Sequence, residues 1–255
     1  MEALSGVVRR VAALYDLHGN LPALEAILVE CERLGVELLV VGGDVFPGPL
    51  ARECLALLRG QRLPCRFLRG NGENEVLSAR AGRPLTRVPE AYRAPLEWHA
   101  RELPDDEAAW IEGWPASFEL ELAELGRVLL CHATPRDDNE LFTRLTPADR
   151  LAPAFADVRA PLVVCGHTHM PFDRRVGKLR VVNAGSAGMP FGRTGADWLL
   201  LGPDVELRHT DFDLDVALAR LRVSAFPQPD FVESSLRTPP PIEAMTELFE
   251  RAALR

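Results

Sequence analysis

The stretch that decides the fold is Leu162-Val163-Val164-Cys165-Gly166-His167-Thr168-His169, a short apolar run that ends in Gly-His-Thr-His. Four consecutive apolar residues before a glycine are typical of a buried strand. Side chains two positions apart share a face, so His167 and His169 are expected together at one edge of a sheet. Histidine is the commonest transition-metal ligand, and α/β proteins place their chemistry in loops after parallel strands. Taken alone, this stretch is explained equally well by two solvated loop histidines.

Four further apolar runs end in polar residues that can bind metal, usually with glycine beside them. They are Val11–Leu14 before Asp16 and His18, Leu38–Val41 before Gly43-Asp44, Arg66–Leu68 before Gly70-Asn71, and Val128–Cys131 before His132. Glycine permits unusual backbone angles and the close approach of a ligand. Five such junctions in one chain are hard to obtain by accident, and they favour a metal site built from the ends of several strands.

The ordered set Asp16-x-His18, Gly43-Asp44, Gly70-Asn71, His132 and Gly166-His167-x-His169 resembles the five blocks of the calcineurin-like metallophosphoesterases. It covers the chain from about Val11 to Ser186 and is most similar to the small single-domain prokaryotic branch, which includes phosphodiesterases and diadenosine-tetraphosphatase-like enzymes. The resemblance implies an α/β fold, a four-layer α/β/β/α sandwich of two mixed sheets with a helical insertion near the active site.

The resemblance also implies a dinuclear metal centre. Asp16, His18 and His169 would hold one divalent ion, Asn71, His132 and His167 would hold the other, and Asp44 would bridge the two. Imidazole and carboxylate ligands suit Mn, Fe, Zn, Co or Ni better than calcium. The implied reaction is hydrolysis of a phosphodiester, a nucleotide or a dinucleoside polyphosphate, in which a metal-bridging hydroxide attacks phosphorus in line. Asp44, Asn71 and His132 are the expected catalytic residues.

The chain departs from many relatives at Gly72, where they carry a histidine that protonates the leaving group or assists that step. The proton would then come from water or from another residue, unless the substrate has a good leaving group. His99 is a speculative substitute, although a solvent-exposed helix histidine is the favoured interpretation. Two other functions remain possible from the sequence: that of a phosphomonoesterase, including a protein-phosphatase-like enzyme, and that of a catalytically weak metal-binding scaffold.

Asn20, Asn71 and Arg193 are the candidate substrate-binding residues. Asn20 follows the first block and could approach the substrate phosphate, but a turn-forming asparagine explains it nearly as well. Arg193 could bind an anionic group through its guanidinium fork, but a surface arginine is the commoner outcome.

The length of 255 residues suits one metallophosphoesterase domain over residues 1–225, with a helical insertion at about 76–115. The insertion is expected to carry helices at Glu90–Glu102 and Asp105–Gly113 and to lean over the pocket. Residues 226–255 are expected to form a proline-rich tail, extended over Phe226–Pro241, followed by a small amphipathic helix at Ile242–Ala253. That helix would dock on its own domain or on a second subunit, which leaves a homo-oligomer open.

Composition limits the partners and the compartment. The net charge of −8 argues against general nucleic-acid binding, which requires clustered Lys and Arg. No run approaches the ~20 apolar residues of a membrane span. The N-terminus lacks the basic-then-apolar order of a signal peptide. Five cysteines, odd in number and widely spaced, fit a reducing cytoplasm better than a disulfide framework.

Overall fold

The alternation of side chains along β1 (Val11–Leu14) determines how the fold is layered. In the computed structural model, which describes residues 7–254, Val11 and Ala13 pack between two sheets, whereas Ala12 and Leu14 pack against helices. All four side chains are fully buried because both faces of this strand are covered. β1 is therefore a central strand, and it anchors the residues that follow it, Asp16 and His18.

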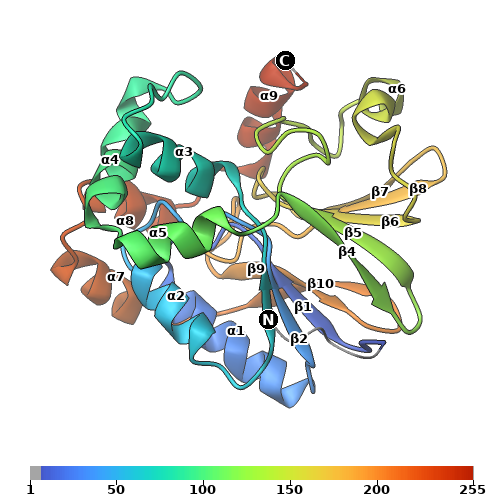
Figure 1. Cartoon of the computed structure of the whole chain (residues 1–255), viewed down its shortest axis with the longest axis horizontal. Coiled ribbons are helices and arrows are strands. Elements are labelled where there is room, and N and C mark those ends of the chain that lie inside the picture. The colour runs from blue at the N-terminus through green and yellow to red at the C-terminus, as the bar shows by residue number, and fades with distance from the viewer. Residues whose placement is uncertain (1–6, 255) are drawn as a thin grey trace.

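The first sheet has the strand order β10-β9-β1-β2-β3 (Figure 1). Its other strands are β2 (Leu38–Val41), β3 (Cys65–Phe67), β9 (Ala196–Leu201) and β10 (Val205–Thr210). β1, β2 and β3 run parallel, and β9 pairs antiparallel with β1. Helices α1 (Leu21–Arg33) and α2 (Ala51–Arg59) cover its outer face, where Leu24, Ile27 and Leu55 pack against the sheet. The strand–helix–strand rhythm of the sequence predicted this half.

The second sheet has the order β4-β5-β6-β8-β7. Its strands are β4 (Ser117–Leu122), β5 (Gly126–Cys131), β6 (Leu162–Cys165), β7 (Phe172–Val176) and β8 (Leu179–Asn183). Helix α6 (Ala148–Leu151) and the 3-10 turn η2 (Ala152–Phe155) cover the face turned away from the first sheet. The buried hydroxyl of Tyr15 donates a hydrogen bond to the Val164 carbonyl 3.1 Å away and so links the two sheets. Two mixed sheets between helical layers confirm the four-layer sandwich.

The insertion after β3 is helical. It contains α3 (Asn71–Arg80), the 3-10 turn η1 (Glu90–Tyr92), α4 (Arg93–Glu102) and α5 (Asp105–Glu112). The last helix begins at the first of the two aspartates, where acidic side chains favour a helix N-terminus. Both predicted helices of the insertion are confirmed within one to three residues.

The expectation of an extended tail over Phe226–Pro241 is wrong. After α7 (Leu214–Val223), the chain forms α8 (Pro229–Arg237) and then α9 (Ile242–Ala252). Pro229 occupies the first helical turn, where its missing N–H costs nothing, and Val232 and Leu236, four positions apart, pack on Leu221. The predicted domain boundary at residue 225 stays a prediction. Within residues 7–254, none of the helices combines the length and the apolar character needed to cross a bilayer.

Candidate metal centre

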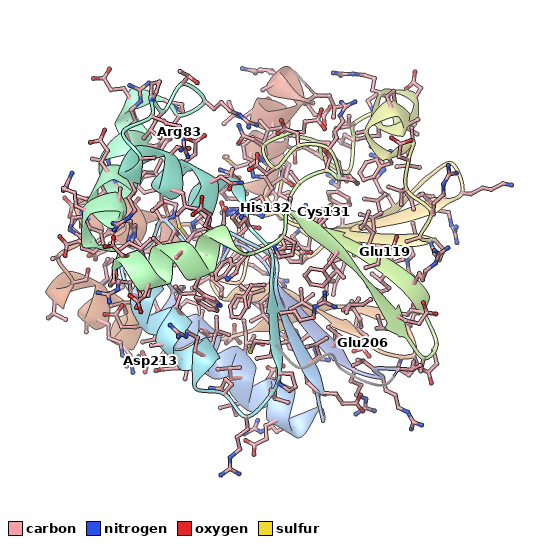
Figure 2. All side chains as sticks on the ribbon, in the orientation of Figure 1. Arg83, Glu119, Cys131, His132, Glu206 and Asp213 are labelled. Carbon is pink, nitrogen blue, oxygen red and sulfur yellow. The ribbon has the colours of Figure 1, made fainter. Side chains whose placement is uncertain are left out.

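The carboxyl ends of β1, β2, β5 and β6 meet at one edge of the two facing sheets. Because β1 runs parallel to β2 and β5 to β6, the residues that follow each pair emerge at the same end. In Figure 2, His132 lies at the centre of the molecule, directly after Cys131 at the end of β5. The polar residues that the sequence places after separate strands are thereby gathered into one site.

The backbone of this site is strained at the residues that carry the chemistry. Asp16, His18, Asp44, His167 and His169 have φ values of 53°, 43°, 53°, 68° and 55°. Over residues 7–254, the one other non-glycine residue with positive φ is Leu254. Such conformations cost on the order of 1–3 kcal/mol each and persist where the surroundings enforce them, often at functional sites.

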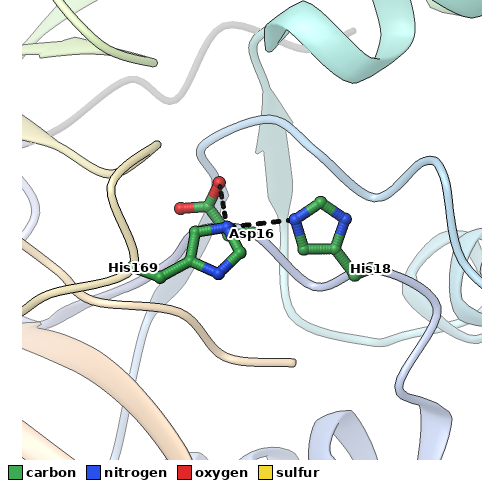
Figure 3. A group of neighbouring side chains, drawn as sticks. All are labelled: Asp16, His18 and His169. Carbon is green, nitrogen blue, oxygen red and sulfur yellow. Dashed lines mark hydrogen bonds and ion pairs between the residues drawn. The ribbon is translucent and has the colours of Figure 1, made fainter. Parts of the chain in front are cut away.

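Asp16, His18 and His169 form the first of two ligand groups (Figure 3). The Nε2 atoms of the two imidazoles lie 3.1 Å apart, and Nε2 of His169 lies 3.5 Å from Oδ1 of Asp16. The three ligand atoms thus surround a space of the size that one ion fills.

The second group contains Asp16, Asp44 and His132, so Asp16 belongs to both. Nε2 of His132 lies 3.8 Å from Oδ1 of Asp16 and 3.5 Å from Oδ1 of Asp44. Asn71 joins this group, since its Oδ1 lies 3.1 Å from the same Nε2. Asp44 also reaches toward the first group, with Oδ2 4.0 Å from Nε2 of His18.

Two buried polar atoms of the site have no hydrogen-bond partner: Oδ1 of Asp16 and Nε2 of His167. The His167 ring lies 5.1 Å from the His132 ring, next to the second group. Orphaned buried polar atoms are rare and need an explanation. A cation would satisfy both atoms, so the donor set fits divalent metal.

Backbone carbonyls orient three of the histidines. The Nδ1 atoms of His18, His132 and His169 lie 3.0, 2.8 and 2.8 Å from the carbonyls of Pro47, Gly42 and Met189. An Nδ1–H that donates to a carbonyl orients the ring, and in the neutral imidazole it makes Nε2 the nitrogen that can bind metal. All three Nε2 atoms face the shared space.

Burial dominates the electrostatics of the site. Burial lowers the pKa of His18 to about 4, and the neighbouring His169 lowers it further. Burial likewise lowers the pKa of His167 to about 3, and His132 adds to this effect. Both imidazoles are therefore neutral at pH 7. Burial raises the pKa of Asp44 to about 8; Glu73 and Asp16 add to this, and His132 opposes it. An Asp44 carboxylate is therefore costly without added positive charge, as expected of a cation site.

The pKa values of Asp16 and His132 shift in the directions that favour an ion pair between the two side chains. Burial raises the pKa of Asp16, but the three neighbouring histidines outweigh it and hold the pKa well below its usual range. Burial lowers the pKa of His132, but Asp44 and Asp16 outweigh it and raise the pKa to about 9.

Glu73 is an important residue that the sequence interpretation missed. Its buried carboxylate accepts hydrogen bonds from the backbone N–H groups of Asp44, Val45, Phe46 and Gly70, at 2.9, 2.8, 3.2 and 2.8 Å. It therefore fixes the loop that carries Asp44 relative to the start of α3. Burial raises the pKa of Glu73, and the hydrogen bonds from Gly70, Asp44 and Phe46, together with the charge of His132, oppose that rise. The available signal was an acidic residue three positions after Gly70, in the capping-box position of a helix.

Two other buried residues support the site loops. Asn183 donates from Nδ2 to the Gly166 carbonyl at 2.6 Å, and Ser186 donates from Oγ to the Asp16 carbonyl at 2.7 Å. The sequence interpretation gave neither side chain a role.

The geometry does not bring Asn20 or Arg193 to the site with a free polar group. Asn20 caps α1, accepting from the Ala23 N–H at 3.2 Å and donating to the Gly188 carbonyl at 2.8 Å. Arg193 pairs with Asp197 at 2.8 Å. These contacts give both side chains structural roles, and binding of substrate by either stays a prediction without geometric support.

The favoured interpretation of His99 as a solvent-exposed residue is wrong, because the side chain is buried. Its Nε2 accepts a hydrogen bond from the Gly48 N–H at 3.0 Å, and burial lowers its pKa to about 4. A neutral imidazole that already accepts a backbone proton is a poor general acid. His99 instead holds the loop after Asp44 against α4.

A family profile described as the calcineurin-like phosphoesterase superfamily domain matches residues 10–202. The chain belongs to this superfamily of metal-dependent phosphoric ester hydrolases.

Three proteins match most of this chain, one by sequence and two by structure. The uncharacterized protein MJ0912 of Methanocaldococcus jannaschii is 24% identical over 238 residues, which cover 86% of this chain and 94% of that protein. The metallophosphoesterase of Sphaerobacter thermophilus has a TM-score of 0.70 and 22% identity, with 91% and 99% of the two chains covered. The hypothetical protein PH1004 of Pyrococcus horikoshii has a TM-score of 0.72 and 19% identity, with 89% and 97% covered.

Proposed function

We propose that the protein is a dinuclear metal-dependent phosphodiesterase. The observation that carries the proposal is the pair of ligand groups that share Asp16, with imidazole Nε2 atoms and carboxylate oxygens turned into one buried space. Superfamily membership supports phosphoric ester hydrolysis, and the arrangement of ligands supports two ions rather than one.

In this proposal Asp16, His18 and His169 hold one ion, Asn71, His132 and His167 hold the second, and Asp44 bridges them. Bound divalent ions supply a nucleophilic water of lowered pKa and neutralise charge that develops on the phosphoryl oxygens. The backbone carbonyls behind His18, His132 and His169 orient these rings, so that Nε2 is the nitrogen that each presents to an ion. Glu73 keeps the Asp44 loop in position.

Gly72 shapes the leaving-group side of the reaction. Its N–H donates to Oδ1 of Asp44 at 2.7 Å, and a Cβ at this position would come within 1.9 Å of the Phe46 carbonyl oxygen. The local backbone therefore admits no side chain here that could donate a proton. We infer that the enzyme favours esters whose alcohol leaves readily as the anion.

The test is hydrolysis of bis(p-nitrophenyl) phosphate by protein loaded with Mn²⁺. Asp44→Ala is expected to abolish turnover, whereas Asp106→Ala, at an exposed position of α5, is expected to leave it unchanged. Full activity of Asp44→Ala would overturn the proposal. Faster cleavage of p-nitrophenyl phosphate than of the diester would instead indicate a phosphomonoesterase.

Metal content and turnover together distinguish an enzyme from a metal-binding scaffold. Elemental analysis of the loaded protein is expected to give about two equivalents of Mn, Fe, Zn, Co or Ni per chain. Bound metal with no turnover of either ester would favour the catalytically weak metal-binding scaffold. The proposal includes a cytoplasmic location and small phosphate esters as substrates, supported by the acidic charge and the free cysteines.

A further inference from the structure

A large cavity of about 610 Å³ opens directly beside the candidate metal centre. His18, Asp44, Asn71 and His169 form part of its lining, so anything bound there lies within reach of the ions that these residues would hold. Segments far apart in the chain supply the rest of the lining: the insertion, the loop after β8, and the region of α8 and α9 (Figure 1).

The lining away from the metal ligands is strongly apolar and aromatic. It includes Tyr92, Phe191, Phe226, Phe231, Leu248 and Phe249. Tyr92, Phe231 and Leu248 are 50%, 48% and 53% exposed, which is unusual for such large apolar side chains. A cavity that keeps several of them in contact with water is suited to a ligand that covers them.

The aromatic side chains are continuous with the metal site. The Phe191 ring stacks on the His169 ring at 5.4 Å between centroids, and Phe249 lies 6.1 Å beyond Phe191. A phosphate held at His169 would therefore have its organic substituent against Phe191 and the α9 side chains.

The lining offers little to a second phosphate. Among the described residues that line the cavity, Arg87 is the one lysine or arginine, and it already pairs with Asp137 at 2.6 Å and Asp138 at 3.3 Å. Glu75 also lines the cavity and adds negative charge. Dinucleoside polyphosphates and nucleic acids reward several free cations, which this wall lacks.

We propose that the cavity binds an uncharged, apolar group of the substrate, so that the preferred substrates are phosphodiesters with an aryl or alkyl substituent. This inference rests on the proposed function, because it takes the scissile phosphate to be held at the metal centre. It assigns the C-terminal segment 226–249 to substrate specificity.

Binding of phosphonates to the Mn²⁺-loaded protein tests the inference without turnover. By isothermal titration calorimetry, phenylphosphonate and hexylphosphonate are expected to bind at least about tenfold more tightly than methylphosphonate, because each buries several more apolar carbons. The two probes distinguish an aryl pocket from an alkyl pocket. Equal affinity for all three phosphonates would overturn the inference, and so would adenosine 5′-monophosphate binding more tightly than phenylphosphonate.

Single variants locate the effect. Phe231→Ser and Leu248→Ser are expected to reduce the preference for the larger phosphonates severalfold and to leave methylphosphonate affinity unchanged. Val223→Ser is the matched control, since Val223 is 86% exposed and lies outside the cavity lining. A preference that survives both cavity variants would refute the assignment of the wall.

The outcomes separate this inference from the proposed function. Binding of all phosphonates without a size preference, in a protein that hydrolyses bis(p-nitrophenyl) phosphate, contradicts the inference alone. A size preference in a loaded protein that hydrolyses neither monoester nor diester contradicts the proposed function. Failure of every phosphonate, including methylphosphonate, to bind would count against both.

Discussion

Replacing Glu73 with glutamine is expected to destabilise the protein and to weaken metal binding together. The carboxylate accepts two backbone N–H groups on each oxygen, from Val45 and Phe46 on Oε1 and from Asp44 and Gly70 on Oε2. Glutamine keeps one oxygen, and its amide NH₂ would face two N–H donors. Two buried hydrogen bonds to a charged group are lost, each contributing about 1.5–3 kcal/mol, so the free energy of unfolding should fall by about 3–6 kcal/mol.

Urea denaturation of the metal-free protein measures this loss, and calorimetric titration with Mn²⁺ measures the effect on the site. Metal affinity should fall because the Asp44 backbone is no longer held. Glu121→Gln, at an exposed position on β4, is the control and should change stability by less than about 0.5 kcal/mol. A Glu73→Gln protein that loses less than about 1 kcal/mol and binds Mn²⁺ like the parent would refute the role assigned to this carboxylate.

Three further predictions concern the same region. Gly72→Ala should lower stability by about 1–3 kcal/mol and reduce diester hydrolysis, because its methyl group meets the Phe46 carbonyl. Gly202→Ala, whose methyl group would lie 3.7 Å from its nearest neighbour, should do neither, and urea denaturation and turnover test both variants. The pKa of His99 is about 4 in the folded protein and has its ordinary value of 6.5 in the unfolded protein, so unfolding between these pH values takes up a proton. The free energy of unfolding should therefore fall by about 3 kcal/mol as the pH is lowered from 6.5 to 4. His99→Gln should flatten this part of the pH–stability curve. Since the pKa of Asp44 is raised to about 8, Mn²⁺ binding at pH 7 should release protons, and titrations in buffers of different ionisation enthalpy that show no release would contradict this.

Three of the strands that carry the site, β1, β2 and β6, were predictable because each is a short apolar run with both faces covered. β1, β2 and β6 match their predicted bounds. β7 lies at the sheet edge and was not predicted, since Asp173, Arg174 and Arg175 separate its two buried ends and leave no period-two pattern. The helix α8 was hidden by the flanking prolines, although one of them starts it.

The candidate metal residues were predictable because ligand chemistry depends on residue type. Asp, Asn or His follows each of the five apolar runs, in the order that the family resemblance requires. The sequence gives weaker signals for residues that act through the backbone. Glu73 is an ordinary acidic residue until the fold brings the four N–H groups around it. His99 looked exposed because its helix carries many polar residues, and its burial depends on tertiary contacts with Phe46 and Phe226.

These supporting residues explain how five residues with left-handed backbone conformations coexist in one site. Strain of about 1–3 kcal/mol at each position is comparable in sum with the stability of a whole domain, about 5–15 kcal/mol, so the loops need specific restraint. Each strained loop has one: Glu73 binds the backbone around Asp44, Ser186 binds the Asp16 carbonyl, and Asn183 binds the Gly166 carbonyl beside His167. None of the three belongs to the proposed ligand set, and all are buried. The ligand geometry is therefore supported by side chains outside the ligand set, which means that metal affinity and phosphoesterase activity should depend on these three side chains as well as on the ligands.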